Sequence, residues 1–224
     1  MPDRQTIVVS AWFLLFAAWV AALPFLVSLD GGSIAIVVFT YAFADAGSYL
    51  FHYIVDHYGR ADHPGIVAEF QGHHADPGRI ARRPLVEVLY PAARIITPWS
   101  ALALMLALAG WLPSGSALFL FVLGSCWVYT QLFHRWAHLR EPPAVIAWLQ
   151  RSGLILRATA HDRHHRLPFM TDFAVINGWT NPLFDAIDLP KWVDWVLEKG
   201  LGIPKRSTLV EDMAALRLEN RHSL

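Results

Sequence analysis

Long apolar runs separated by short polar turns dominate the first two thirds of the chain. A helix that crosses a bilayer needs about 20 mostly apolar residues. Four runs meet this requirement, with approximate bounds of 7–29, 34–55, 95–112 and 117–137. Tight turns at Asp30–Ser33 and Pro113–Gly115 join the first span to the second and the third to the fourth. The pattern predicts an all-α membrane protein with four transmembrane helices arranged in two hairpins.

Positive charges are unevenly divided among the connecting segments. The tight turns contain no Lys or Arg, whereas the loop between the second and third spans contains Arg60, Arg79, Arg82 and Arg83. Residues 138–224 are also rich in both types. Because cytoplasmic loops carry such an excess, we expect this loop, both termini and a histidine-rich helical cap over 138–224 to be cytoplasmic. The first run contains Pro24 and lacks a clear cleavage site, which favours a retained span over a cleaved signal peptide.

Three segments after the fourth span are also predicted to be helical, the first because its apolar residues have helical spacing. Residues 144–156 and 192–201 are predicted to lie on the membrane as interfacial helices, the second because it contains Trp192 and Trp195. Residues 208–224 are predicted to form a short amphipathic helix. Since no internal repeat or linker is visible, residues 1–224 are predicted to form a single domain.

Composition narrows the possible functions. Hydrophobic residues make up 55% of the chain and charged residues 16%, against roughly 25% charged residues in a soluble domain. The formal net charge is zero, so there is no electrostatic argument for nucleic-acid binding. The single cysteine, Cys126, lies in an apolar run, which excludes an internal disulfide and a thiolate metal site.

The chain contains 11 histidines, and most of them form clusters at helical spacing. Side chains four residues apart lie on one face of a helix, close enough to share a metal. With one aspartate, the clustered residues are His52, Asp56, His73, His74, His134, His138, His161, His164 and His165. The topology above places all of them at one membrane face, so we expect them to meet.

These clusters contain more ligands than one metal can use. A single such histidine is more often a hydrogen-bonded core residue or a surface ring, but nine candidates exceed a zinc site of three or four ligands. Nine protein ligands suit two metals whose coordination number is five or six. Imidazole and carboxylate without thiolate favour iron, with zinc and manganese as alternatives. A zinc protease would require His-Glu-x-x-His, but Arg135 follows His134. The sequence therefore predicts a di-iron centre.

The predicted metals and their place at the membrane indicate a reaction class. Two Fe ions with O2 as co-substrate supply an oxidant strong enough to remove hydrogen from an unactivated methylene group of a lipid. The chain has no nucleotide-binding fingerprint and no cysteines for an iron–sulfur centre, so electrons must come from a separate protein. Desaturation of a lipid alkyl or acyl chain is the main interpretation. Hydroxylation at the same site and a non-enzymatic membrane metal-binding sensor are the alternatives.

Five stretches resemble the Kua/CarF lipid desaturase family, which includes plasmanylethanolamine desaturases and a plastid phosphatidylglycerol palmitate desaturase. The stretches are Asp45–Asp56, Phe70–Pro77, Gln131–His138, His161–Pro168 and Gly178–Asn181. They follow one another in the family's order and extend over more than half of the chain.

The resemblance implies a membrane-lipid substrate and an electron donor of the cytochrome b5 or ferredoxin type. It also implies that the nine clustered residues are iron ligands or their immediate neighbours. By analogy with the members that form vinyl ethers, it implies conversion of an alkyl-ether phospholipid into a plasmalogen. A phospholipid-linked fatty-acyl desaturase is the alternative within the family.

Other polar residues are predicted to support the site or to lie outside it. Asp45 is on the same helix face as His52, so it is a candidate to orient a ligand ring through the second ring nitrogen. Further candidates for a supporting role are Gln131, Asp162, Asp172 and Asn181. The histidines expected to face solvent are His57, His63 and His222.

Overall fold

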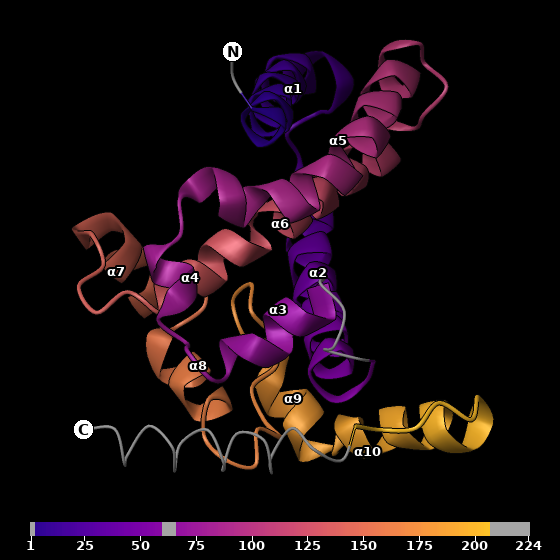
Figure 1. Ribbon diagram of the computed structural model, residues 1–224. Coiled ribbons are helices and arrows are strands. Elements are labelled where there is room, and N and C mark those ends of the chain that lie inside the picture. Colours follow the sequence, from indigo (N-terminus) through magenta and orange to yellow (C-terminus); the bar gives the residue numbers. More distant parts are fainter. Residues whose placement is uncertain (1–2, 60–65, 207–224) are drawn as a thin grey trace. The chain divides into compact units, whose positions relative to one another are not determined.

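The computed structural model describes residues 3–59 and 66–206, and the regular elements within them are all helical (Figure 1). The long helices are α1 (Arg4–Leu26), α2 (Gly31–His57), α5 (Leu85–Leu108) and α6 (Ser114–Ala137). The short elements are α3 (Ile66–His73), α4 (Arg79–Arg82), α7 (Ala144–Arg151), α8 (Ala158–His164), α9 (Asn181–Ala186), α10 (Leu189–Asp194) and the π-helix η1 (Trp195–Gly200).

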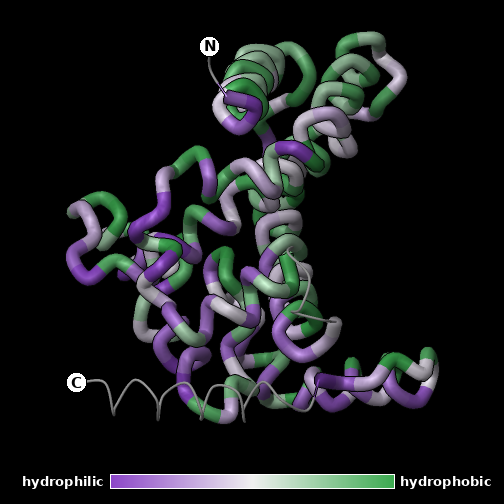
Figure 2. The backbone as a smooth tube through the Cα atoms, viewed as in Figure 1, coloured by the Kyte–Doolittle hydropathy of each residue, from purple (hydrophilic) through white to green (hydrophobic). Residues whose placement is uncertain are grey.

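The four long helices are long and apolar enough to cross a membrane. Figure 2 shows hydrophobic residues concentrated along α1 and α2, whereas the segments around α3, α4 and α8 contain many hydrophilic residues. The prediction of an all-helical protein with four long apolar helices that are able to span a membrane is confirmed. The pairing of the spans into hairpins and the cytoplasmic location of the cap stay predictions, and the predicted helix over 208–224 lies outside the described residues.

The third long helix differs from its predicted bounds. It begins at Leu85, ten residues before the expected start near 95, and both Pro91 and Pro98 lie inside it. A proline inside a helix removes one backbone hydrogen bond, but membrane helices tolerate this loss where neighbouring groups satisfy the backbone. The first turns also contain Glu87, which accepts a hydrogen bond from Arg83 over 3.2 Å. These charges make the start of α5 less apolar, so hydropathy alone places the span too late.

Contacts divide the chain into two compact units. The first unit comprises Met1–Ala44 and Arg83–Phe133. Within it, α1 packs against α5 and α6 around the buried rings of Trp12 and Trp19. The indole of Trp19 donates to the Ser100 hydroxyl over 3.0 Å, so the buried N–H is satisfied.

The second unit comprises Asp45–Arg82 and His134–Leu224, so α2 and α6 each contribute residues to both units. One hydrophobic cluster of this unit contains Tyr49, Tyr53, Tyr58, Phe173 and Ala174, all buried. Apolar residues of α9, α10 and η1 pack against that cluster. The cluster therefore joins the end of α2 to the C-terminal helices.

The two segments predicted to be interfacial are helical over part or all of their length. The first forms α7, which ends at Arg151, because Gly153 adopts a left-handed φ of 73°. The second coincides with α10 and η1. Their location at a membrane surface stays a prediction.

Candidate metal centre

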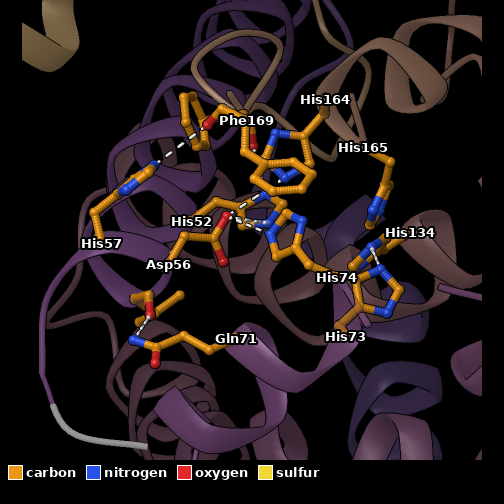
Figure 3. A network of polar contacts seen from close by, with 12 residues as sticks. His52, Asp56, His57, Gln71, His73, His74, His134, His164, His165 and Phe169 are labelled. Carbon is orange, nitrogen blue, oxygen red and sulfur yellow. Dashed lines mark hydrogen bonds and ion pairs between the residues drawn. The ribbon is translucent and has the colours of Figure 1, made fainter. Parts of the chain in front are cut away.

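The structure gathers all nine clustered residues in the second unit, in two groups of possible metal ligands. The five-histidine group consists of His73, His134, His138, His161 and His165. The Asp56 group consists of His52, Asp56, His74 and His164. In each group the ligand atoms lie within 4.8 Å of one another. Figure 3 shows members of both groups pointing toward one another from separate helices.

The ends of α2, α3, α6 and α8 bring these side chains together. In chain order, the residues are His52 and Asp56 on α2, His73 and the adjacent His74 at the end of α3, His134 on α6 and His138 just beyond it, and His161, His164 and the adjacent His165 at the end of α8. Spacings of three and four residues direct the side chains at the ends of α2, α6 and α8 to a common face, whereas His73 and His74 are adjacent and join different groups. The sequence therefore builds the centre from local helical pairs that only tertiary packing unites.

The Nε2 atoms of the five-histidine group converge. The distance between the Nε2 atoms of His73 and His134 is 2.9 Å, that between His138 and His161 is 2.8 Å, and that between His134 and His138 is 3.3 Å. With metal–nitrogen bonds of about 2.1 Å, neighbouring ligands are about 3.0 Å apart in an octahedron and about 3.4 Å apart in a tetrahedron. The five nitrogens thus fit one metal with five or six ligands better than a tetrahedral one.

The rings of this group are held in the neutral form that binds metals. Burial, followed by the charges of neighbouring histidines, lowers the pKa of His138 to about 4 and that of His161 well below its usual range. The Nδ1 atoms of His134 and His161 are buried without a hydrogen-bond partner among the described residues. Hydrogen bonds between the rings therefore do not satisfy all of their buried nitrogens. A shared metal would bind the lone pairs of the converging Nε2 atoms.

The Asp56 group differs because it contains a carboxylate. The Oδ2 atom of Asp56 lies 2.9 Å from Nε2 of His74 and 3.4 Å from Nε2 of both His52 and His164. The side chains of these four residues are at most 1% exposed. Within the described chain, Nε2 of His52, Nε2 of His164 and Oδ1 of Asp56 have no hydrogen-bond partner. Buried polar atoms rarely lack partners, so this group also fits a metal, with three nitrogens and one carboxylate.

The two groups are neighbours. The ring centroids of His74 and His165 are 4.9 Å apart, and those of His164 and His165 are 5.3 Å apart. The rings of His52 and His134 also approach each other, at 5.8 Å. Two metals in these groups would therefore lie side by side in one buried centre.

An extended segment, residues 171–180, lies against the Asp56 group, and we call it the strap. The carbonyl oxygen of Phe173 lies 2.9 Å from Nδ1 of His52, and that of Thr171 lies 3.0 Å from Nδ1 of His164. A carbonyl only accepts, so in both rings Nδ1 carries the hydrogen and Nε2 presents its lone pair. The strap thereby sets the tautomer of two candidate ligands.

Asp45 fastens the strap to α2. Its Oδ1 atom accepts the backbone N–H groups of Asn177 and Gly178, each over 3.0 Å, and its Oδ2 atom accepts the N–H and the hydroxyl of Thr180. The sequence predicted direct contact with a ligand ring, but both oxygens are committed to the strap. Asp45 is fully buried. Its effect on the metal centre is therefore indirect and passes through the backbone of residues 171–180.

Other side chains complete the attachment of the strap. Asn181 accepts from the N–H of Ala174 over 2.8 Å, and Ser48 accepts from that of Val175 over 3.1 Å. Gly178 has a φ of 76°, and a Cβ there would come within 3.2 Å of the Asn181 amide, so glycine is required.

A bidentate ion pair links the strap to α8. Arg163 binds Asp172 at 2.7 and 2.8 Å, and this pairing raises the pKa of Arg163. Arg163 was not among the predicted site residues, because an arginine between two histidines has no distinctive spacing. Asp172, one of the supporting candidates, stabilises the strap next to Thr171.

Three remaining candidates have different environments. His57 is buried and its Nε2 lies 3.3 Å from the carbonyl oxygen of Phe169, so the expectation that it faces solvent was wrong. His57 follows Asp56 directly and is the last residue of α2. The packing around this end of the helix buries it. Asp162 is exposed. Gln131 is half-buried in the first unit, and its supporting role stays a prediction. His63 and His222 lie outside the described residues.

Comparison with known proteins shows the same family that the motifs suggest. The family model for the lipid desaturase domain, which is a sequence model, matches residues 41–208. The chain is 33% identical to fatty acid desaturase 4 of Arabidopsis thaliana over 173 aligned residues. This alignment covers 75% of the chain and 52% of that protein. It is 32% identical over 152 residues to plasmanylethanolamine desaturase of Myxococcus xanthus, covering 65% of the chain and 53% of the relative.

The chain spans about half the length of these curated relatives. No solved structure matches it. The matched region, residues 41–208, contains both groups of possible ligands and the whole strap.

Proposed function

The chain belongs to the lipid desaturase family, and from this premise we propose that it introduces a double bond into the hydrocarbon chain of a membrane lipid at a di-iron centre. Membership of the family implies an oxidoreductase. The metals, the use of O2 and the choice of lipid are our inference. The observation that best supports the proposal is the convergence of five Nε2 atoms beside a second group of three histidines and one carboxylate.

The ligand set favours iron over other metals. Two groups of five and four ligands leave positions open on both metals if each takes six. Imidazole and carboxylate donors suit iron, and the separations of 2.8 to 3.3 Å in the five-histidine group do not suit tetrahedral zinc. Iron bound there would supply, with O2, the oxidising power to remove hydrogen from a methylene group.

The protein's own residues prepare the centre for that chemistry. The strap fixes His52 and His164 with Nε2 toward Asp56, so little reorganisation is needed when the metal binds. The fully buried rings of Phe169 and Phe173 lie 4.7 Å from His74 and 4.9 Å from His164, and they exclude water from this side of the centre. A dry centre protects a strong oxidant from side reactions.

The overall reaction is balanced by an external donor. Two hydrogens leave adjacent carbons of the lipid as two electrons and two protons, and O2 takes these together with two electrons from the donor and two protons from solvent to form two water molecules. A one-electron carrier protein of the cytochrome b5 or ferredoxin type is the proposed donor.

The relatives suggest two classes of lipid substrate. The Myxococcus protein is named a plasmanylethanolamine desaturase and the Arabidopsis protein a fatty acid desaturase. We therefore propose an alkyl-ether phospholipid, which would yield the vinyl ether of a plasmalogen, with a phospholipid-linked acyl chain as the alternative. A vinyl ether is cleaved by mild acid, whereas an acyl double bond is not.

Lipid mass spectrometry of a host that lacks related enzymes tests the proposal. Cells expressing the protein should accumulate a lipid that has lost two hydrogens, and cells expressing His138→Ala should not. A lipid that gains one oxygen atom would instead identify a hydroxylase. If neither change occurs in cells supplied with both substrate classes and a donor protein, the proposed function is wrong.

A further inference from the structure

The C-terminal helices have two apolar faces, and within residues 45–59, 66–82 and 134–206 only one of them packs against the rest of the second unit. We call residues 181–200, which contain α9, α10 and η1, the limb. The inward-facing residues, Phe184, Leu189, Val193 and Leu197, pack on the cluster around Tyr53 and Phe173. The outward-facing residues are Leu183, Ile187, Trp192, Trp195 and Val196, which are 47–62% exposed.

The outward face is aromatic, and one lysine and one aspartate lie beside its two tryptophans. Trp192 and Trp195 are each 62% exposed, and together with Ile187, Asp188 and Lys191 they line an open groove of about 350 Å³. Monomeric soluble proteins rarely expose clustered apolar surface of this kind. Tryptophan with nearby lysine is the combination that favours the headgroup layer, where the indole ring is half-solvated and the ammonium meets lipid phosphate.

The limb attaches to the C-terminal end of α2, a helix that is longer than the hydrocarbon core is thick. α2 has 27 residues, so it is about 40 Å long at 1.5 Å per residue, whereas the hydrocarbon core is about 30 Å thick. Tyr53 and Tyr58 in and just after the last turns of α2 each donate a hydrogen bond to Asp194 of α10. The limb is thereby tied to the end of a membrane-spanning helix.

The direction of the limb agrees with a location at the membrane surface. Figure 1 shows α10 running across the end of α2 and not alongside it. A helix that crosses a transmembrane helix at its end lies along the membrane plane, where one long face can remain in contact with lipid.

We propose that the limb is a membrane-surface element whose outward face, centred on Trp192 and Trp195, rests in the phospholipid headgroup layer. The occupant of the groove is a phospholipid of the surrounding bilayer, with Lys191 next to its phosphate. The inference concerns a surface separate from the metal centre, and it holds whether or not the enzyme acts on the lipids that the limb contacts.

Spin labels on single cysteines test the proposal in the intact protein. Cys126 is first replaced by Ala, and a nitroxide is attached to Trp192→Cys, Trp195→Cys or, as the matched control on the exposed polar side of η1, Glu198→Cys. The proteins are placed in nanodiscs of equal parts phosphatidylcholine and phosphatidylglycerol. Collisional relaxation is measured with O2, which concentrates in lipid, and with a water-soluble nickel chelate.

The ratio of oxygen to nickel accessibility should be several-fold higher at positions 192 and 195 than at 198. Equal nickel accessibility at all three positions would place the outward face in water and overturn the proposal. Protection of 192 and 195 from both reagents would also overturn it, because a protein surface would then cover the face. Metal content and elution volume equal to those of the wild type identify labelled variants that fold.

Discussion

His52 donates from Nδ1 to the carbonyl oxygen of Phe173 over 2.9 Å, although the two residues are 121 positions apart in the chain. The bond joins α2 to the strap and leaves Nε2 of His52 directed toward Asp56, 3.4 Å from its Oδ2 atom. His164 is held in the same way by Thr171. The orientation of two candidate ligands therefore depends on where the backbone of residues 171–180 lies.

Removing the carboxylate of Asp45 should loosen the strap. Asp45→Ala leaves three N–H groups and a hydroxyl without their buried acceptor, and each unsatisfied group costs about 1–3 kcal/mol. We expect a free energy of unfolding lower by at least about 3 kcal/mol and reduced iron content. Asp45→Asn, which keeps one acceptor, should be milder. Thermal unfolding in detergent and elemental analysis measure both effects, with exposed Glu141→Gln as the control. Wild-type iron content in Asp45→Ala would contradict this role of the strap.

The two groups of ligands should lose metal separately. Among the described residues, Asp56 is the one carboxylate in the two groups, so Asp56→Asn removes the charge that favours a cation in its own group. We expect about one iron per chain in this variant instead of two, because the five-histidine group is intact. Elemental analysis of purified protein provides the count. Two tightly bound irons in Asp56→Asn would show that the carboxylate is dispensable.

Acidification should destabilise the protein before the carboxylates titrate. Burial lowers the pKa of His138 to about 4 from its usual 6.5, so between these values the unfolded chain binds more protons than the native one. Stability therefore rises with pH across this window and is lost as pH falls below about 6.5. Metal binding weakens in the same direction, because protons compete for the ring. Unfolding midpoints of metal-free protein between about pH 5 and pH 8 measure the slope, which should be shallower in His138→Asn.

His57 supplies a matched histidine control for the metal centre. It is buried next to Asp56, but its Nε2 faces the Phe169 carbonyl and its ring centroid lies 4.7 Å from that of Tyr53. His57→Gln should lose about 1 kcal/mol of stability and keep the iron content of the wild type. His138→Ala should lose iron. A loss of iron in His57→Gln equal to that in His138→Ala would place His57 among the ligands.

Local spacing identified the nine residues that the structure brings together, and their role as metal ligands stays a prediction. Pairs such as His134 and His138 need only the helical repeat to share a face, and the apolar runs identify the four spans. The division into groups of five and four could not be predicted, because it depends on how α2, α3, α6 and α8 pack. The start of α5 was missed because charges and prolines interrupt the hydropathy signal before Pro98.

The contacts of the strap could hardly be predicted from the sequence. Its hydrogen bonds to His52 and His164 come from carbonyl groups, which every residue has, so no side-chain pattern marks them. Asp45 was recognised as polar and suitably spaced, but its target is backbone far along the chain. Three residues of this region have a specific requirement: Gly178 for a left-handed turn, Asn181 for an amide that pairs with Ala174, and Asp172 for the ion pair with Arg163.

Because main-chain oxygens hold the two imidazoles, the side chain at position 171, which is exposed, is free to change without disturbing the protonation pattern of the metal ligands. The same is not true of Asp45, Ser48 and Asn181, which keep the peptide groups in place. Sequence drift should thus be tolerated at position 171, whereas Asp172, which pairs with Arg163, and the buried Phe173 should stay constant although they lie beside the same two imidazoles.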